Sequence, residues 1–227
     1  MNPNSSELSA TKKIYALLVG IDQYAPDSEV PKLNGCENDI KAIEAYLTEE
    51  IKGKEERKWE LFEPRVLINE QATRQGIIDG FQQYLCQAGS DDIALFYYSG
   101  HGGQQKAPEE LLYLDPDGLN ETLVCYDSRS PGGYDLADKE LRYLLAKVAE
   151  KEPRVIVIFD CCHAGAGTRS VEGTRLAPDD TRDRPLSTLI FAQDETFNNS
   201  LSTSSKVEKK KTGLDLPKGR HILLAAC

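Results

Sequence analysis

The sequence predicts an α/β fold with a mainly parallel β-sheet flanked by helices. Short apolar runs alternate along the chain with segments whose apolar residues recur at helical spacing, which is the pattern of repeated βαβ units. The 227 residues are enough to bury a core without disulfides. Hydrophobic residues make up 40% of the chain and charged residues 28%, which excludes disorder of the whole chain and a collagen-like fibre.

The predicted elements follow one another in βαβ order. Buried strands are expected at 14–21, 64–68, 93–98 and 155–159, because each run is apolar and too short for a buried helix. Helical stripes are expected at 38–47, at 73–89 with Thr73 as N-cap and Gly89 at the end, and at 138–150. Short apolar pieces between 111 and 135, separated by Asp, Pro and Gly, indicate a small hairpin.

The C-terminal part has a different character. Ser, Thr, Asp, Lys and Arg dominate residues 166–218, so we expect a mobile, solvated loop or processing linker in which only 186–192 could form a strand. Residues 221–226 predict one more buried strand. No turn or helix follows that strand, so we expect part of a longer protein, with an N-terminal tail at 1–12, one domain at 13–227 and room for an effector or sensor domain beyond Cys227.

Charge and composition exclude several classes of protein. The formal net charge of -10 has the wrong sign for a phosphate-backbone binder, so we expect no nucleic-acid partner. No apolar stretch approaches a membrane span and the N-terminus is no signal peptide, so a cytoplasmic location is expected. The six cysteines contain no C-x-x-C pair and are interpreted as thiols.

Two strand ends carry residues that could do chemistry. His101 follows the strand at 93–98, and Cys161, Cys162 and His163 follow the strand at 155–159. Ligands of open α/β sheets bind beyond the carboxyl ends of strands. A thiol nucleophile with an imidazole base is the pair that acyl transfer needs, because the imidazole takes the thiol proton and returns one to the leaving amine.

Strand alternation distinguishes the two neighbouring cysteines. Side chains two residues apart face the same way, which groups Cys162 with Asp160 and Cys161 with Phe159. The same count groups Ser99 with His101. Cys162 therefore shares a face with a carboxylate and is favoured as the nucleophile.

Other readings of these residues exist. A buried cysteine is usually a small hydrophobic residue, and a histidine between glycines is usually a satisfied loop residue. A zinc site of Cys161, Cys162, His163 and His101 fits by ligand type, but three consecutive residues do not readily converge on one tetrahedral ion. The glycines around His101 are a weak signal for a phosphate loop, since no Lys or helix follows.

At these positions the sequence resembles the caspase-like cysteine peptidases, particularly the metacaspases and their prokaryotic relatives. The matching pieces occur in the family's order: YALLVGIDQY, LNGCENDI, INEQATRQGI, YYSGHGGQ, ETLVCYD and FDCCHAG. The resemblance implies a caspase-like fold, with His101 as general base and Cys162 as nucleophile. It also implies that the backbone N–H groups of Gly102 and Cys162 hold the oxyanion.

The resemblance further implies an acidic S1 site for Arg or Lys. Its four positions are Cys36, Asp39, Ser99 and Asp160, and we call them the S1 group. Two carboxylates suit a guanidinium or an ammonium and disfavour an acidic P1 residue. The calcium positions of some metacaspases fall on Asn120, Asp138, Lys139 and Arg169, of which one is acidic, so we expect no metal, no cofactor and no calcium dependence.

The sequence thus predicts a thiol endopeptidase that cleaves proteins after Arg or Lys through a Cys-His dyad, an acyl-enzyme intermediate and basic P1 recognition. Self-cleavage is expected in the segment 166–218, which carries several basic residues. A catalytically silent caspase-like scaffold or interaction module is the alternative, and a non-peptidase Cys-His hydrolase is a weaker one.

Overall fold

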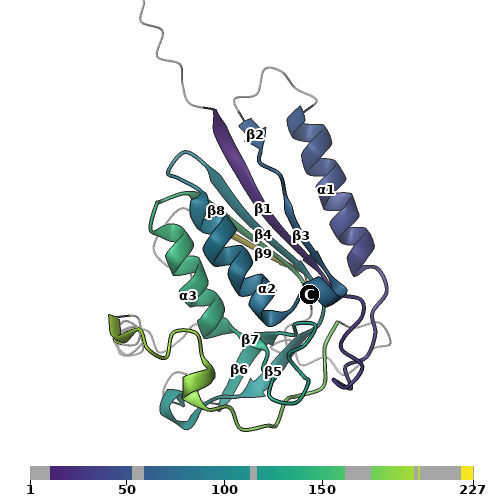
Figure 1. Ribbon diagram of the computed structural model, residues 1–227, viewed down its shortest axis with the longest axis vertical. Helices are drawn as coiled ribbons and strands as arrows, with labels where there is room; N and C mark the ends of the chain where they lie inside the picture. The colour runs from purple at the N-terminus through teal and green to yellow at the C-terminus, as the bar shows by residue number, and fades with distance from the viewer. Residues whose placement is uncertain are drawn as a thin grey trace, which may run out of the picture.

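A single parallel β-sheet forms the centre of the molecule (Figure 1). The computed structural model describes residues 11–52, 59–112, 117–161, 175–196, 199 and 221–226. The sheet order is β2-β1-β4-β8-β9. β3 also pairs with β1, at residues 17–20, whereas β2 pairs with β1 at residues 12–14. All of these pairs are parallel, which confirms the predicted fold class. The strands are β1 (Lys12–Gly20), β2 (Trp59–Leu61), β3 (Arg65–Ile68), β4 (Ile93–Ser99), β8 (Arg154–Asp160) and β9 (His221–Ala226).

Helices cover both faces of this sheet, and strand alternation explains why. Leu17 and Val19 of β1 belong to the larger core, whereas Ala16 and Leu18 belong to a second core that includes Ile40 of α1. The helix α1 therefore lies on one face, and α2 and α3 lie on the other (Figure 1). The bounds are α1 (Cys36–Lys52), α2 (Arg74–Asp79) and α3 (Asp138–Ala149).

The helix expected at 73–89 is present with its predicted start. The Thr73 side chain accepts a hydrogen bond from the Gly76 N–H at 3.0 Å, and the helical path continues beyond α2 as a π-helical turn and a 3-10 turn to Gln87. None of the described helices is long and apolar enough to cross a bilayer.

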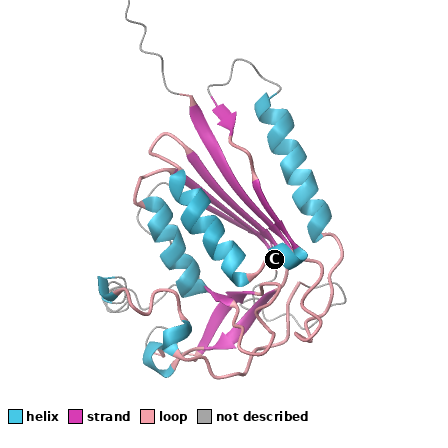
Figure 2. Ribbon diagram, viewed as in Figure 1, coloured by secondary structure: helices cyan, strands magenta, loops and turns pink. Residues whose placement is uncertain are grey.

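A small antiparallel sheet lies below the main sheet in the view of Figure 2, and its first strand begins immediately after His101. It consists of β5 (Gly102–Lys106), β6 (Leu119–Leu123) and β7 (Leu136–Ala137). The hairpin expected before α3 exists as the antiparallel pair β6–β7, but its strands lie at 119–123 and 136–137, so the expected bounds of 111–135 are wrong. The strand β5 has the sequence GGQQK, which contains no apolar side chain. A search for hydrophobic periodicity therefore cannot predict this strand or its pairing with β6.

Two expectations for the C-terminal part need correction. The strand at 221–226 exists as β9, but it is an edge strand of the described sheet, and Ile222, Leu223 and Leu224 are exposed rather than buried. The strand expected at 186–192 is wrong, because Leu186–Thr188 forms a 3-10 turn after Pro185. The apolar residues of that segment, Leu189 and Phe191, are instead buried against Leu111 in a separate small core.

Part of the segment 166–218 is folded onto the domain. Within the described range 175–196, Leu176 and Asp180 form isolated parallel bridges with Gly102 and Gln105 of β5. The expected solvated loop therefore does not describe this stretch. Residues 166–174, 197–198 and 200–218 lie outside the described residues.

Candidate active site

The predicted site residues that the structure describes lie where β1, β4 and β8 end and α1 begins. Gly20 pairs with Ser99, and Ser99 pairs with Asp160, so these strand ends lie side by side. The start of α1 is fixed by Asp22, whose carboxylate accepts the N–H groups of Cys36 and Glu37, each at 3.0 Å.

The electrostatics of Asp22 agree with this capping role. Burial acts to raise the pKa of the Asp22 carboxyl, but the backbone hydrogen bonds from Glu37 and Cys36 outweigh it and lower the pKa below its ordinary value of 3.8. An ionised carboxylate at a helix N-terminus also interacts favourably with the helix dipole. Asp22 therefore sets the position of the first turn of α1, which carries Cys36 and Asp39.

Three residues of the S1 group, Asp39, Ser99 and Asp160, contact the guanidinium of Arg175. Arg175 Nη2 lies 2.7 Å from Asp39 Oδ2, and Arg175 Nη1 lies 2.6 Å from Asp160 Oδ2. The same Nη1 donates to Ser99 Oγ at 2.7 Å and to the Asp160 carbonyl at 2.9 Å. Ser99 Oγ in turn donates to Asp39 Oδ2 at 2.9 Å. The structure thus brings Asp39, Ser99 and Asp160 together as hydrogen-bonding partners of a basic side chain.

Two pKa shifts describe this environment. Burial acts to lower the pKa of Arg175, but the hydrogen bond to Asp39 and the negative charges of Asp160 and Asp39 raise it above its ordinary value. Burial raises the pKa of the Cys36 thiol to about 11, so Cys36 is a neutral thiol at pH 7. A neutral, buried thiol is not a nucleophile, so Cys36 is not a candidate for that role.

The backbone of His101 is held on both sides. Its N–H donates to Tyr24 Oη at 2.8 Å, and its carbonyl accepts from Tyr98 Oη at 2.7 Å and from the Val124 N–H at 3.0 Å. The preceding Gly100 makes this possible, because a Cβ there would lie 2.7 Å from Tyr98 Oη. Both tyrosines lie in the motif pieces YALLVGIDQY and YYSGHGGQ, but their hydroxyl contacts with the His101 backbone join separate segments and have no local sequence pattern.

The imidazole of His101 has the hydrogen-bonding arrangement of a general base. Nε2 lies 2.9 Å from the Pro31 carbonyl oxygen, which can only accept, so Nε2 carries the proton and Nδ1 carries the lone pair. Nδ1 is buried and has no hydrogen-bond partner among the described residues. Sequence reasoning missed Pro31, which acts through its backbone carbonyl.

The environment favours the neutral form of this ring. Burial is the largest influence and lowers the pKa of His101 below 6.5, and the cationic Arg129 and Arg175 act in the same direction. The Pro31 and Arg175 carbonyls act in the opposite direction without overcoming it. At pH 7 the imidazole is therefore neutral and able to take a proton.

The predicted alternation around β8 is partly visible. Cys161 is buried in the larger core with Phe159, whereas Asp160 contacts Arg175 on the other side of the strand. Gly102 donates its N–H to the Arg175 carbonyl at 2.9 Å. Cys162 and His163 lie outside the described residues, so the nucleophile and the second oxyanion donor stay predictions.

A lysine ammonium lies among the residues expected at the calcium positions. Lys139 Nζ donates to Asn120 Oδ1 at 2.8 Å and to Asp138 Oδ1 at 3.1 Å, and Asn120 and Lys139 are buried. Arg169 lies outside the described residues. Across the described ranges no group of three or more His, Cys, Asp or Glu side chains could hold a metal ion.

Comparisons with known proteins agree on one family. The metacaspase peptidase C14 domain matches residues 13–169. Metacaspase-1B of Neurospora crassa is 31% identical over 150 residues, which cover 66% of this chain and 33% of that protein. Metacaspase-1 of Botryotinia fuckeliana is 31% identical over 157 residues, covering 69% of this chain and 36% of that protein. The chain thus spans about a third of the length of these relatives.

A solved structure extends the likeness to the fold. This chain is similar to a protein from Geobacter sulfurreducens whose crystal structure is known, with 28% sequence identity and a TM-score of 0.57. The matched region covers 95% of this chain and 73% of the Geobacter chain.

Proposed function

Because the chain belongs to the metacaspase family of C14 peptidases, we propose that it is a cysteine endopeptidase that cleaves proteins after Arg or Lys. One observation supports the specificity above all others: the guanidinium of Arg175 lies between the carboxylates of Asp39 and Asp160 and contacts Ser99. A site that holds an internal arginine in this way has the charge and hydrogen-bonding groups for a P1 Arg or Lys of a substrate.

The proposed reaction begins with His101. The neutral Nδ1 removes the proton from the thiol of Cys162, and the thiolate attacks the carbonyl carbon that follows the P1 side chain. The hydrogen bond from Nε2 to Pro31 keeps the ring in the required tautomer and stabilises the imidazolium that forms. The imidazolium then gives its proton to the leaving amine, and water hydrolyses the thioester.

The Gly102 N–H supports the oxyanion part of this proposal. This N–H donates to the Arg175 carbonyl oxygen at 2.9 Å, and the Arg175 side chain contacts Asp39, Ser99 and Asp160 of the S1 group. In the proposed reaction the same N–H, together with that of Cys162, stabilises the negative charge that develops on the substrate oxygen. Cleavage of this kind needs no metal or cofactor.

Hydrolysis of a peptide with P1 Arg tests the proposal. We expect Cys162→Ala to abolish turnover and Cys161→Ala to retain most of it, because Cys161 is packed in the core. Each substitution is made in the wild-type chain and in an Arg175→Gln chain, so that an occupied S1 group is not mistaken for an inactive enzyme.

Two outcomes would contradict the proposal. Equal loss in both cysteine variants, or loss only in Cys161→Ala, would overturn the assignment of the nucleophile. Absence of turnover in the Arg175→Gln chain, with the fold intact by circular dichroism, would favour the silent scaffold instead.

A further inference from the structure

The loop of residues 124–135 supports the carbonyl side of the His101 backbone. The Val124 N–H donates to the His101 carbonyl at 3.0 Å. Tyr98 Oη lies 2.7 Å from that carbonyl oxygen and 2.8 Å from the Val124 carbonyl oxygen, so it connects the two main chains. We call residues 124–135 the support loop. Its position limits where the His101 main chain can lie.

The support loop also reaches the N–H side of His101 through a second segment. The Ala25 N–H donates to the Tyr126 carbonyl at 3.0 Å, and the neighbouring Tyr24 accepts the His101 N–H on its hydroxyl at 2.8 Å. The rings of Tyr24 and His101 lie close together, with centroids 5.4 Å apart. A shift of the support loop would therefore disturb His101 from both sides.

Apolar packing contributes little to holding this loop. Its first two residues, Val124 and Cys125, belong to the larger core, but none of residues 126–135 belongs to any of the three described cores. The buried residues of that stretch are Ser128 and Asp135, and both are polar. The conformation of the loop therefore depends on hydrogen bonds and ion pairs.

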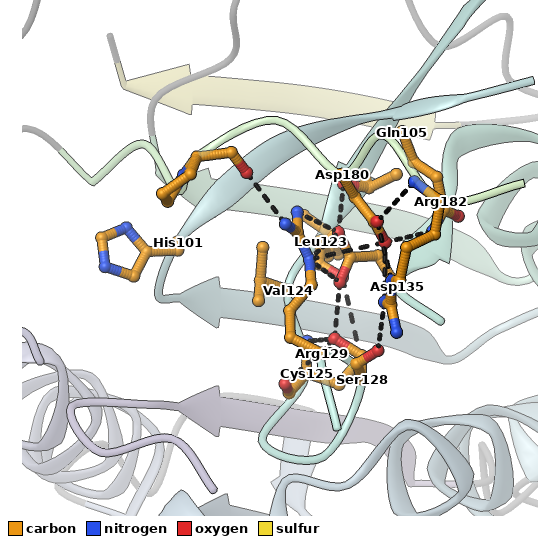
Figure 3. A network of polar contacts seen from close by, with 12 residues as sticks. His101, Gln105, Leu123, Val124, Cys125, Ser128, Arg129, Asp135, Asp180 and Arg182 are labelled. Carbon is orange, nitrogen blue, oxygen red and sulfur yellow. Dashed lines mark hydrogen bonds and ion pairs between the residues drawn. The ribbon is translucent and has the colours of Figure 1, made fainter. Parts of the chain in front are cut away.

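The carboxylate of Asp135 closes the loop (Figure 3). It is fully buried and pairs with Arg129, whose Nη2 lies 2.6 Å from Oδ2 and whose Nε lies 2.8 Å from Oδ1. It also accepts hydrogen bonds from the hydroxyls of Ser128 at 2.5 Å and Thr122 at 2.9 Å. Ser128 Oγ in turn accepts the Cys125 N–H at 3.1 Å. These contacts join the two ends of the support loop.

Arg129 connects the closed loop to the strand that follows His101. A Cβ on Gly103 would lie 2.9 Å from Arg129 Nη2, so the guanidinium lies directly against the β5 main chain two residues after His101. Arg129 Nη1 also donates to the Pro178 carbonyl at 2.8 Å. Burial is the main cause of the lowered pKa of His101, and the positive charge of Arg129 acts in the same direction.

We propose that the Arg129–Asp135 ion pair positions His101 for proton transfer. The proposal rests on the proposed function, in which His101 is the general base. Arg129 and Asp135 act through the support loop and β5, so both are positioning residues. Proton transfer is sensitive to such a role, because a displacement of about 1 Å can reduce a rate about a hundredfold.

Another ion pair on β5 provides a comparison. Lys106 pairs with Asp183 at 2.5 Å, but both side chains are exposed, and an exposed pair contributes little to the stability of a fold. The Arg129–Asp135 pair is buried, so removing one partner leaves a buried charge without compensation. Loss of Arg129 should therefore displace the support loop, whereas loss of Lys106 should not.

Steady-state kinetics with a P1 Arg peptide tests this role. All variants are made in the Arg175→Gln chain, so that the S1 group is free in each of them. We expect Arg129→Gln to lower kcat at least about tenfold while KM changes less than about threefold, because the S1 group lies on α1, β4 and β8. Lys106→Gln is the matched control and should keep the kcat of its parent chain.

Two more variants separate positioning from a general loss of stability. Phe191→Leu disturbs the small core that contains neither His101 nor the support loop, so it should lower the free energy of unfolding without lowering kcat of the folded chain. Arg129→Lys keeps the buried positive charge, so it should fold even if Arg129→Gln does not. Its ammonium cannot reproduce the two-pronged contact with Asp135, so kcat should fall at least about threefold with KM unchanged.

NMR of the histidine ring provides a second readout. In a Cys162→Ala chain with labelled histidine nitrogens, the Nε2–H of His101 is hydrogen-bonded to the Pro31 carbonyl and should give a signal that exchanges slowly with water. We expect this signal to shift or broaden in both Arg129 variants and to stay unchanged in the two control variants. A change in stability alone would leave the signal of the folded chain as it is.

The outcomes distinguish this proposal from the proposed function. If the Arg175→Gln chain hydrolyses Arg peptides and the folded Arg129 variants keep its kcat, the positioning role is overturned and the peptidase stands. An equal loss of kcat in Phe191→Leu, a rise in KM alone, or an unchanged His101 signal in the Arg129 variants would also overturn it. If no chain hydrolyses an Arg peptide, both proposals fail.

Discussion

Single hydrogen bonds decide the chemistry assigned to His101. The Pro31 carbonyl 2.9 Å from Nε2 leaves the lone pair on Nδ1, and burial keeps the ring neutral. In the proposed reaction a backbone carbonyl, and not a carboxylate, orients the base. The sequence identifies His101 by its place after β4, but it carries no mark of the carbonyl that fixes the tautomer, because every residue has one.

The first prediction concerns the titration of His101. Its pKa is lowered by burial from 6.5, so the ring should stay neutral until the pH falls below 6.5. The acid limb of kcat/KM should accordingly lie below pH 6.5, since activity is lost when the base is protonated. NMR of histidine-labelled Cys162→Ala chain, with the His101 signal assigned from His101→Gln, measures the titration directly. A midpoint at or above 6.5 would contradict the burial argument.

At the scale of elements, the position of α1 depends on Asp22. Its carboxylate holds two N–H groups of the first turn, so removing it leaves buried donors without a partner. We expect Asp22→Ala to lower the free energy of unfolding by about 1–3 kcal/mol. The measurement is urea unfolding in the Cys162→Ala background. Asp91→Ala serves as control, because among the described residues Asp91 makes only an exposed ion pair with Lys12, worth about 0–1 kcal/mol.

The difference in free energy of unfolding between the Asp22 and the Asp22→Ala proteins should depend on pH with a definite sign. The Asp22 pKa is lower in the folded chain than its ordinary value of 3.8, so the unfolded chain binds the proton first as the pH falls. The stabilisation is complete above pH 3.8 and disappears as the pH falls through the folded value. A gap between the two proteins that widens below pH 3.8 would contradict the capping role.

A second prediction at this scale concerns the contact between β6 and α3. The ammonium of Lys139 donates hydrogen bonds to Asn120 and Asp138, so its buried positive charge would repel a calcium ion at these residues. We expect turnover of an Arg peptide to differ by less than about twofold between excess chelator and millimolar calcium. A rise of tenfold or more on adding calcium would reveal a site built from other carboxylates.

How far the elements could be predicted depends on what stabilises each one. The strands β1, β4 and β8 are apolar on both faces, and α3 has a regular stripe, so all four were identified within a residue or two. The strands β2 and β5 are held by backbone pairing to β1 and β6, and their side chains show no pattern. Burial of Phe191 depends on Leu111, about eighty positions away, and no local rule connects them.

The candidate site divides in the same way. His101, Asp39, Ser99 and Asp160 could be named because strand ends and the family motifs mark them. The contacts of Arg175 with these residues could not be predicted, because fourteen residues separate Asp160 from Arg175 and their sequence does not determine where Arg175 lies. The sequence contributed Arg175 only as one of several basic residues in 166–218.

At the scale of the whole molecule, the formal net charge of -10 favours cationic substrates over acidic ones. In the proposed function, the carboxylates of Asp39 and Asp160, which hold Arg175 at the C-terminal end of β8, concentrate this preference at the P1 side chain. The two effects act at different ranges, since salt screens the net charge but has less effect on half-buried carboxylates in direct contact with a cation. Specificity measured at high ionic strength therefore reports on the S1 group.

Peptides that differ only at P1 test the central claim most directly. The measurement is kcat/KM at about 0.5 M salt for Arg, Lys and Asp peptides, with Asp160→Ala as the variant that weakens the S1 group. We expect Arg and Lys to exceed Asp by at least ~100-fold, because an Asp side chain would lose its hydration facing two like charges. The ratio should fall in Asp160→Ala. Efficient cleavage after Asp by the wild-type chain would contradict the account.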